Sequence, residues 1–160
     1  GRSANLHTGI FRFMEIRTIN PKYRRIARRL ISREPELQYI AESRVRIAFL
    51  ESDAEKAEKG KIIFGQCERV PEKFRWAVHY DFMITVFAPN VERFDRRQME
   101  ALLFHELLHV GIEQDGFEEK YAVVPHDFEE FRTIMERYGL DWSEEKHEQT
   151  GKAQKAGKGS

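Results

Sequence analysis

The sequence predicts one α+β domain, in which a small, mostly antiparallel sheet of three to four strands packs on a central helix and two or three further helices. Three observations predict this class. The chain has 160 residues, which suits one domain with a hydrophobic core. Three stretches carry apolar residues at the spacing of amphipathic helices. Four short stretches have the alternating or continuous apolar pattern of strands.

The folded domain is expected to span residues 21–142. Residues 1–20 show no clean hydrophobic period and are expected to form a flexible N-terminal segment. After Trp142 the chain turns polar, so residues 143–160 are expected to be a disordered tail.

The first helix is predicted to begin at Asn20-Pro21, because asparagine caps a helix and proline is tolerated at its first position. Its buried stripe consists of Tyr23, Ile26, Ala27, Leu30 and Ile31. Arginines fill the other face. Glu34-Pro35 ends this helix, and a short helical segment is expected to resume through residues 39–40.

Three main strands are predicted, at residues 45–49, 61–70 and 79–88. The charged stretch 52–61 is expected to be an exposed loop, and 71–75 a turn. Gly65 indicates a bulge or a site of close approach within the second strand. The third strand is apolar on both faces, which predicts a central or doubly covered position. A further short strand is expected at 121–124.

The central helix is predicted from a capping box formed by Asp95 and Gln98, and it should run to about Val110 and end at Gly111. A second capping box, Asp127 with Glu130, predicts the last helix. The apolar stripe of that helix consists of Phe128, Phe131, Ile134, Met135 and Tyr138, and Gly139 should end it.

The central helix contains the sequence His105-Glu106-Leu107-Leu108-His109, an H-E-x-x-H motif. Positions i and i+4 of a helix project from one face, so the two imidazoles can chelate one Zn²⁺ ion. Glu106, between them, can act as general base toward a metal-activated water. The bare motif also arises by chance, but its place late in a capped amphipathic helix is what this chemistry requires. The motif therefore predicts a zinc-dependent peptidase.

A catalytic zinc site takes three protein ligands and leaves a position for water. His126 is the favoured third ligand, because it stands just before the cap of the next predicted helix. The alternatives are Asp115, Asp127 and a helical glutamate, Glu129 or Glu130. Asp115 lacks the preceding glycine turn of a metzincin, since position 112 is isoleucine. Asp127 and Glu130 are already explained by capping.

Several other groups are candidates for roles at or near the site. Tyr121, His79 and Tyr80 are candidate oxyanion donors, although tyrosines beside strands are usually packing residues. Cys67, the only cysteine, is interpreted as a small core residue. A single cysteine allows no internal disulfide and fits a reducing compartment. No secretory signal pattern and no membrane-length apolar run is present, so cytoplasmic localisation is expected, in the host cell if a phage encodes the chain.

Net charge is zero, but nine basic residues and one acidic residue, Glu15, lie between Arg2 and Arg33. A basic helix at 22–33 can dock nucleic acid. No nucleic-acid motif accompanies it, so a solvated helix face is the favoured interpretation.

The chain resembles the phage metallopeptidase family from about Val45 to Trp142. Four marks carry the resemblance: the segment Tyr80-Asp81-Phe82 leading to Pro89-Asn90, the helix ending in residues 102–110, Pro125-His126-Asp127, and Tyr138-Gly139-Leu140-Asp141-Trp142. The resemblance implies a minimal zincin, similar in outline to the SprT-like and ImmA/IrrE-like peptidases. It also supports His126, because the family pattern has a histidine there.

The expected function is hydrolysis of peptide bonds by one Zn²⁺ per chain, held by His105, His109 and His126, with Glu106 as base. An extended peptide or protein substrate is expected to add to a sheet edge. Two alternatives stay open. One is a DNA-associated or regulatory protein that uses the basic helix, and the other is a phage amidase acting on cell-wall peptides.

Overall fold

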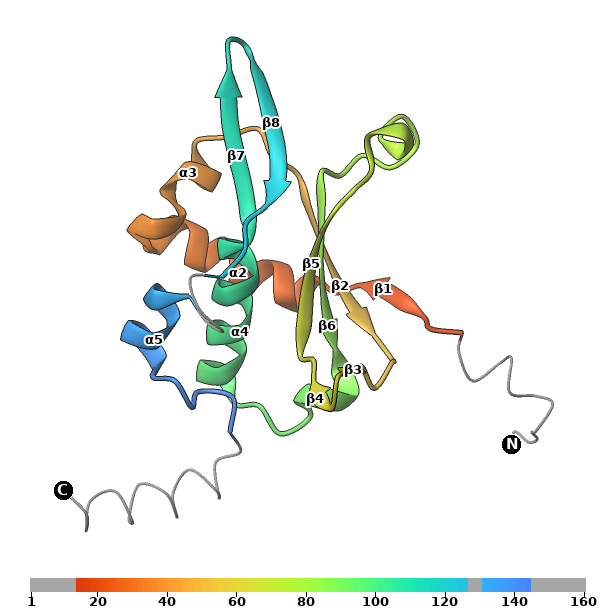
Figure 1. Ribbon diagram of the computed structural model, residues 1–160, viewed down its shortest axis with the longest axis vertical. Coiled ribbons are helices and arrows are strands. Elements are labelled where there is room, and N and C mark those ends of the chain that lie inside the picture. The colour runs from red at the N-terminus through yellow and green to blue at the C-terminus, as the bar shows by residue number, and fades with distance from the viewer. Residues whose placement is uncertain (1–13, 127–130, 145–160) are drawn as a thin grey trace.

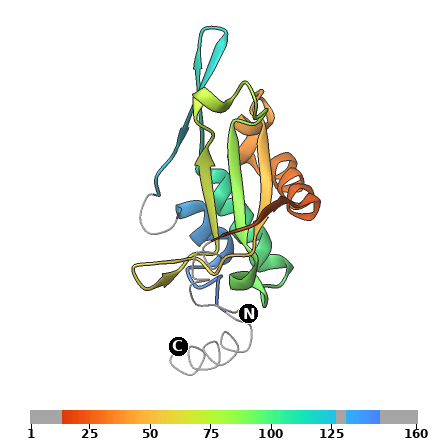
Figure 2. The same ribbon diagram turned by 90° about the vertical axis from the view of Figure 1, so that its right-hand side faces the viewer.

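A four-stranded sheet forms one layer of the molecule (Figures 1 and 2). The computed structural model describes residues 14–126 and 131–144. The strands lie in the order β1-β2-β6-β5, with bounds Arg17–Ile19, Ile47–Ser52, Phe82–Phe87 and Gly65–Arg69 respectively. β2 and β6 run parallel, whereas β1 with β2 and β5 with β6 are antiparallel. The prediction of a small, mostly antiparallel sheet is confirmed.

The helices of the described chain lie on one side of this sheet (Figure 1). They are α2 (Pro21–Arg33), α3 (Gln38–Ala41), α4 (Arg96–Leu108) and α5 (Arg132–Tyr138), and short 3₁₀ turns occupy Pro35–Leu37, Glu72–Phe74 and Ala88–Val91. None of the described helices has the length and apolar character needed to cross a membrane.

Two of the predicted caps are present. The Asn20 side chain accepts hydrogen bonds from the backbone amides of Lys22 and Tyr23, at 2.8 and 3.3 Å. At the start of α4, the amide of Gln98 donates to Asp95 at 2.8 Å, and the amide of Asp95 donates to the Gln98 side chain at 2.9 Å. Each bond satisfies an amide that the helix itself leaves unpaired. The side chains of Asn20 and Asp95 therefore determine where the two helices begin.

The core lies between the sheet and helices α2 and α4. β6 is central, as its apolar sequence predicts, and Phe82, Ile84 and Val86 project from it into this core with no exposed surface. Leu30 of α2 and Leu103 of α4 meet them from the helical layer. α4 is therefore fixed against the sheet along its whole apolar side, which gives its polar residues a rigid support.

The expected end of α4 is wrong. The helix ends at Leu108 with His109 as its C-cap, and the chain then enters a hairpin of β7 (Val110–Asp115) and β8 (Glu118–Val123). Gly111 lies inside β7 and pairs with Ala122, so it does not terminate the helix. A Cβ at Gly111 would lie 2.6 Å from the Ala122 carbonyl oxygen, so close approach of the strands is the reason for this glycine.

Smaller differences concern the segments between elements. The expected loop 52–61 contains part of a small hairpin, β3 (Ala57–Glu58) with β4 (Lys61–Ile62), and β1 forms within the N-terminal segment that was expected to be flexible. α5 begins at Arg132, after Phe131. The predicted capping box of Asp127 and Glu130, and the expected tail beyond residue 144, lie outside the described residues.

Candidate metal centre

Three histidines meet at the end of α4. His105 lies in the last turn of the helix, His109 is its C-cap, and His126 follows β8. One ring nitrogen from each lies within 4.8 Å of the others. The Nε2 atoms of His105 and His126 are 2.8 Å apart, and the ring centroids of His109 and His126 are 4.5 Å apart. The structure thus brings together the three histidines that the sequence singled out.

The hairpin β7–β8 returns the chain to the end of α4 (Figure 1), and two hydrogen bonds hold it there. The Val124 amide donates to the His109 carbonyl at 2.7 Å. His109 Nδ1 lies 2.5 Å from the Val124 carbonyl oxygen. A carbonyl can only accept, so Nδ1 donates this hydrogen bond, and the neutral imidazole then has its lone pair on Nε2. A metal-binding histidine is usually oriented by such a bond.

Phe131 packs against all three rings. Its centroid lies 5.4 Å from that of His105, 4.9 Å from His109 and 5.0 Å from His126, and the side chain is buried. Trp142 adds a more distant contact, 6.4 Å from His105. These aromatic rings restrict the rotamers of the imidazoles and exclude water from one side of the cluster.

Glu106 is 4% exposed, and its Oε2 lies 4.0 Å from Nε2 of His105. It faces the start of β5, where a Cβ added to Gly65 would lie 3.2 Å from Oε2 of Glu106. The predicted close approach at Gly65 is therefore present, and it makes room for this carboxylate. Burial raises the pKa of the Cys67 thiol, and the negative charge of Glu106 raises it further. Cys67 thus stays a protonated, partly buried thiol, in line with a packing role.

The histidines and Glu106 open onto a cleft of about 610 Å³. β5, the outermost strand of the sheet on this side, contributes Gly65, Gln66 and Cys67 to its wall. The remaining walls come from the β3–β4 hairpin, the end of β8 and residues 140–143. The site is thus reached along an edge of the sheet.

The alternative third ligands do not join the described cluster. Asp115 lies at the end of β7, where it pairs with Lys120 at 3.0 Å. Asp127, Glu129 and Glu130 lie outside the described residues. Within the described residues, the candidate metal-binding group at the end of α4 consists of His105, His109 and His126.

The candidate oxyanion donors lie elsewhere. His79 and Tyr80 line a different cavity, beside β2. The Tyr121 hydroxyl donates to Glu119 at 2.7 Å, and burial together with this bond raises its pKa to about 12. None of the three lines the cleft that the structure describes.

Sequence reasoning missed two supports of the cluster. Phe131 was assigned only to a helical stripe, because nothing in a helical period distinguishes packing against a core from packing against imidazoles. Val124 was assigned to a short strand, and its carbonyl contact could have been anticipated only from the hairpin that returns it to His109.

The family model described as "Putative phage metallopeptidase" matches residues 17–153. No curated protein and no solved structure gives a significant match to the chain. The α+β architecture, with its small sheet and supporting helices, is that of a small zincin-like metallopeptidase. The family match covers well over half of the sequence and includes both the histidine cluster and the cleft, so the chain belongs to the phage metallopeptidase family.

Proposed function

We propose that the protein is a zinc-dependent peptidase in which His105, His109 and His126 bind the ion and Glu106 acts as general base. The observation that carries this proposal is the convergence of three imidazoles beside a buried carboxylate, at the wall of an open cleft. A peptidase site requires these parts together, whereas a structural zinc site usually has four protein ligands and no adjacent base.

The donor set suits zinc. Imidazole nitrogens are favoured ligands of Zn²⁺, and a set of three leaves one coordination position for water or substrate. The bond from His109 Nδ1 to Val124 leaves Nε2 available as a donor atom. When bound, zinc supplies Lewis acidity that activates water and polarises the scissile carbonyl.

Glu106 is the group of the chain that moves the proton. Its carboxylate is buried next to the imidazoles, so it is held near the position where water would attack the peptide carbonyl. It would accept the proton of the attacking water and pass it to the leaving amine. Phe131 and Gly65 assist by orienting the rings and by leaving space for the carboxylate.

The substrate that best fits the cleft is an extended peptide. β5 is the last strand of the sheet, so no further strand of the described chain pairs with its outer edge. Its residues Gly65 to Cys67 line the cleft next to the histidines. A peptide added along this edge would gain backbone hydrogen bonds and lie across the proposed zinc.

Zinc content and activity test the proposal separately. His126→Ala should lose zinc on dialysis against a weak chelator, whereas His79→Ala, which changes an exposed histidine outside the cluster, should keep about one ion per chain. Glu106→Gln should keep the metal and lose hydrolysis of a peptide library followed by mass spectrometry. Unchanged zinc affinity in His126→Ala would remove it from the ligand set. Full activity of Glu106→Gln would show that Glu106 is not the general base.

A further inference from the structure

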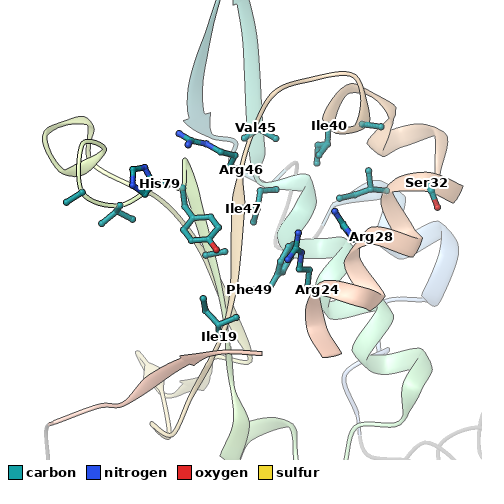
Figure 3. Close-up of a pocket in the computed structure, with 16 residues that line it drawn as sticks. Ile19, Arg24, Arg28, Ser32, Ile40, Val45, Arg46, Ile47, Phe49 and His79 are labelled. Carbon is teal, nitrogen blue, oxygen red and sulfur yellow. The ribbon is translucent and has the colours of Figure 1, made fainter. Parts of the chain in front are cut away.

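A second cavity lies toward the opposite edge of the sheet from the cleft, beside β1 and β2. Its volume is about 1100 Å³, and its walls come from α2, α3, the first half of β2 and residues 77–80 (Figure 3). It shares no lining residue with the cleft beside the histidines. We call it the β2 groove. The proposed peptidase chemistry gives it no role.

The floor of the β2 groove contains an unpaired strand edge. β1 pairs only with residues 50–52 of β2. The Asn20 amide, just after β1, donates to the Phe49 carbonyl at 2.9 Å, so the open part of this edge is Ile47 and Ala48. The Arg46 carbonyl accepts from Phe82 on the β6 side, and backbone groups alternate along a strand. The amide and carbonyl of Ile47 therefore face the groove, together with the Phe49 amide. No described residue hydrogen-bonds them there. Such an edge is a template for another extended chain.

Positive charge lies over this edge. Figure 3 shows Arg24 and Arg28 extending from α2 toward Ile47 and Phe49. α2 carries six basic residues and no acidic one, and both arginines are exposed. Neither forms an ion pair with any carboxylate of the described chain. Apolar side chains, among them Ile31 and Val78, complete the lining.

We propose that the β2 groove binds an extended acidic peptide segment of a partner protein. The segment would pair with the open edge of β2 at Ile47 as an added strand, placing carboxylates beside Arg24 and Arg28 and apolar side chains on the groove walls. The strand edge favours a peptide over nucleic acid, because phosphate oxygens can only accept hydrogen bonds and would leave the Ile47 carbonyl unmatched. The chain's own residues 1–13 fit poorly on charge, because they contain two arginines and no acidic residue.

The location of binding is tested by titrating ¹⁵N-labelled full-length protein with the acetylated octapeptide (Val-Glu)₄. The amide resonances of Ile47 and Phe49 should move with saturation, and those of Gly65 and Cys67 in the other cleft should not. Matched titrations use (Val-Lys)₄ and a single-stranded dT12 oligonucleotide. Shifts confined to β5, or an oligonucleotide that saturates the arginines without moving Ile47, would overturn the proposal.

Two charge-reversal variants test the arginines. Arg24→Glu/Arg28→Glu should weaken (Val-Glu)₄ binding by about tenfold or more, because two attractive contacts become repulsive. Lys22→Glu/Arg25→Glu makes the same change in net charge on exposed residues of the same helix that do not line the groove, and it should bind nearly as wild type. Equal weakening in both variants would mean unspecific attraction to a basic helix and would overturn the proposal.

The strand pairing has its own test. N-methylation of one alternate set of residues in (Val-Glu)₄ removes the amides that would bond to β2, whereas methylation of the other set removes amides that point away. One methylated peptide should lose binding and the other should retain it. Equal affinities for the two peptides would contradict an added strand.

Discussion

Replacing Gly111 with alanine should weaken zinc binding, although Gly111 is not a proposed ligand. A Cβ at this position would lie 2.6 Å from the Ala122 carbonyl oxygen and 2.8 Å from Cγ2 of Val124. Close carbon–oxygen contacts in proteins lie at about 3.3 Å, so β8 would have to move away by roughly 0.7 Å. That movement displaces the carbonyl of Val124 that holds His109 Nδ1.

The expected magnitudes follow from these contacts. Overpacking of this kind costs about 1–3 kcal/mol in the free energy of unfolding. Loss of an orienting hydrogen bond to a metal-binding histidine lowers metal affinity about 10- to 100-fold. Zinc affinity is measured by competition with a chromophoric chelator, and stability by thermal unfolding in excess chelator so that the metal does not contribute.

Gly116→Ala is the matched control. Gly116 is in the turn of the same hairpin, with a φ of 67° and no atom within 4 Å of an added Cβ. Alanine there costs about 1–2 kcal/mol of backbone strain but should leave zinc affinity unchanged. If Gly111→Ala loses stability yet binds zinc like wild type, the Val124 carbonyl does not tune His109. If Gly111→Ala loses no stability, the two strands are not in such close contact.

Two further predictions concern neighbouring residues. Gly65→Ala places a Cβ 3.2 Å from Oε2 of Glu106 and 3.2 Å from the Thr85 carbonyl oxygen. The kcat of peptide hydrolysis should therefore fall severalfold, while zinc content stays at one per chain. Loss of zinc would contradict a selective effect on the carboxylate. Tyr39 donates to the Val110 carbonyl at 2.5 Å, and burial raises its pKa to about 12. The folded state thus keeps a proton that the unfolded state releases, so the contribution of Tyr39 to the free energy of unfolding should be constant below about pH 10 and fall between pH 10 and 12. In urea titrations across this range, Tyr39→Phe should show a smaller fall, and an identical fall would refute the assignment.

The parts of the fold that the sequence predicts are those that local chemistry determines. Asn20 and Asp95 set the starts of α2 and α4 through side-chain hydrogen bonds within three residues. The central position of β6 follows from its apolar composition. The parallel pairing of β2 with β6 could not be predicted, because it joins residues about 35 positions apart with no turn between them to set register.

In the candidate site, too, some features follow from local sequence and others depend on long-range pairing. His105 and His109 share a helix face by helical geometry alone. The position of His126 depends on the hairpin β7–β8. The sequence did not predict this hairpin, because a glycine such as Gly111 commonly ends a helix. Pairing between the two strands outweighed that local preference. The sequence therefore identified the third histidine without the element that delivers it.

The hairpin also bears on how zinc would stabilise the fold. All three histidines fall within 22 consecutive residues, 105–126, so an unfolded chain needs to close only a short loop to bring them together. Part of the proposed metal affinity would then be available before the sheet has formed. Because an ion that also binds the denatured chain stabilises the native state less, zinc should raise the melting temperature by less than its native affinity alone would give.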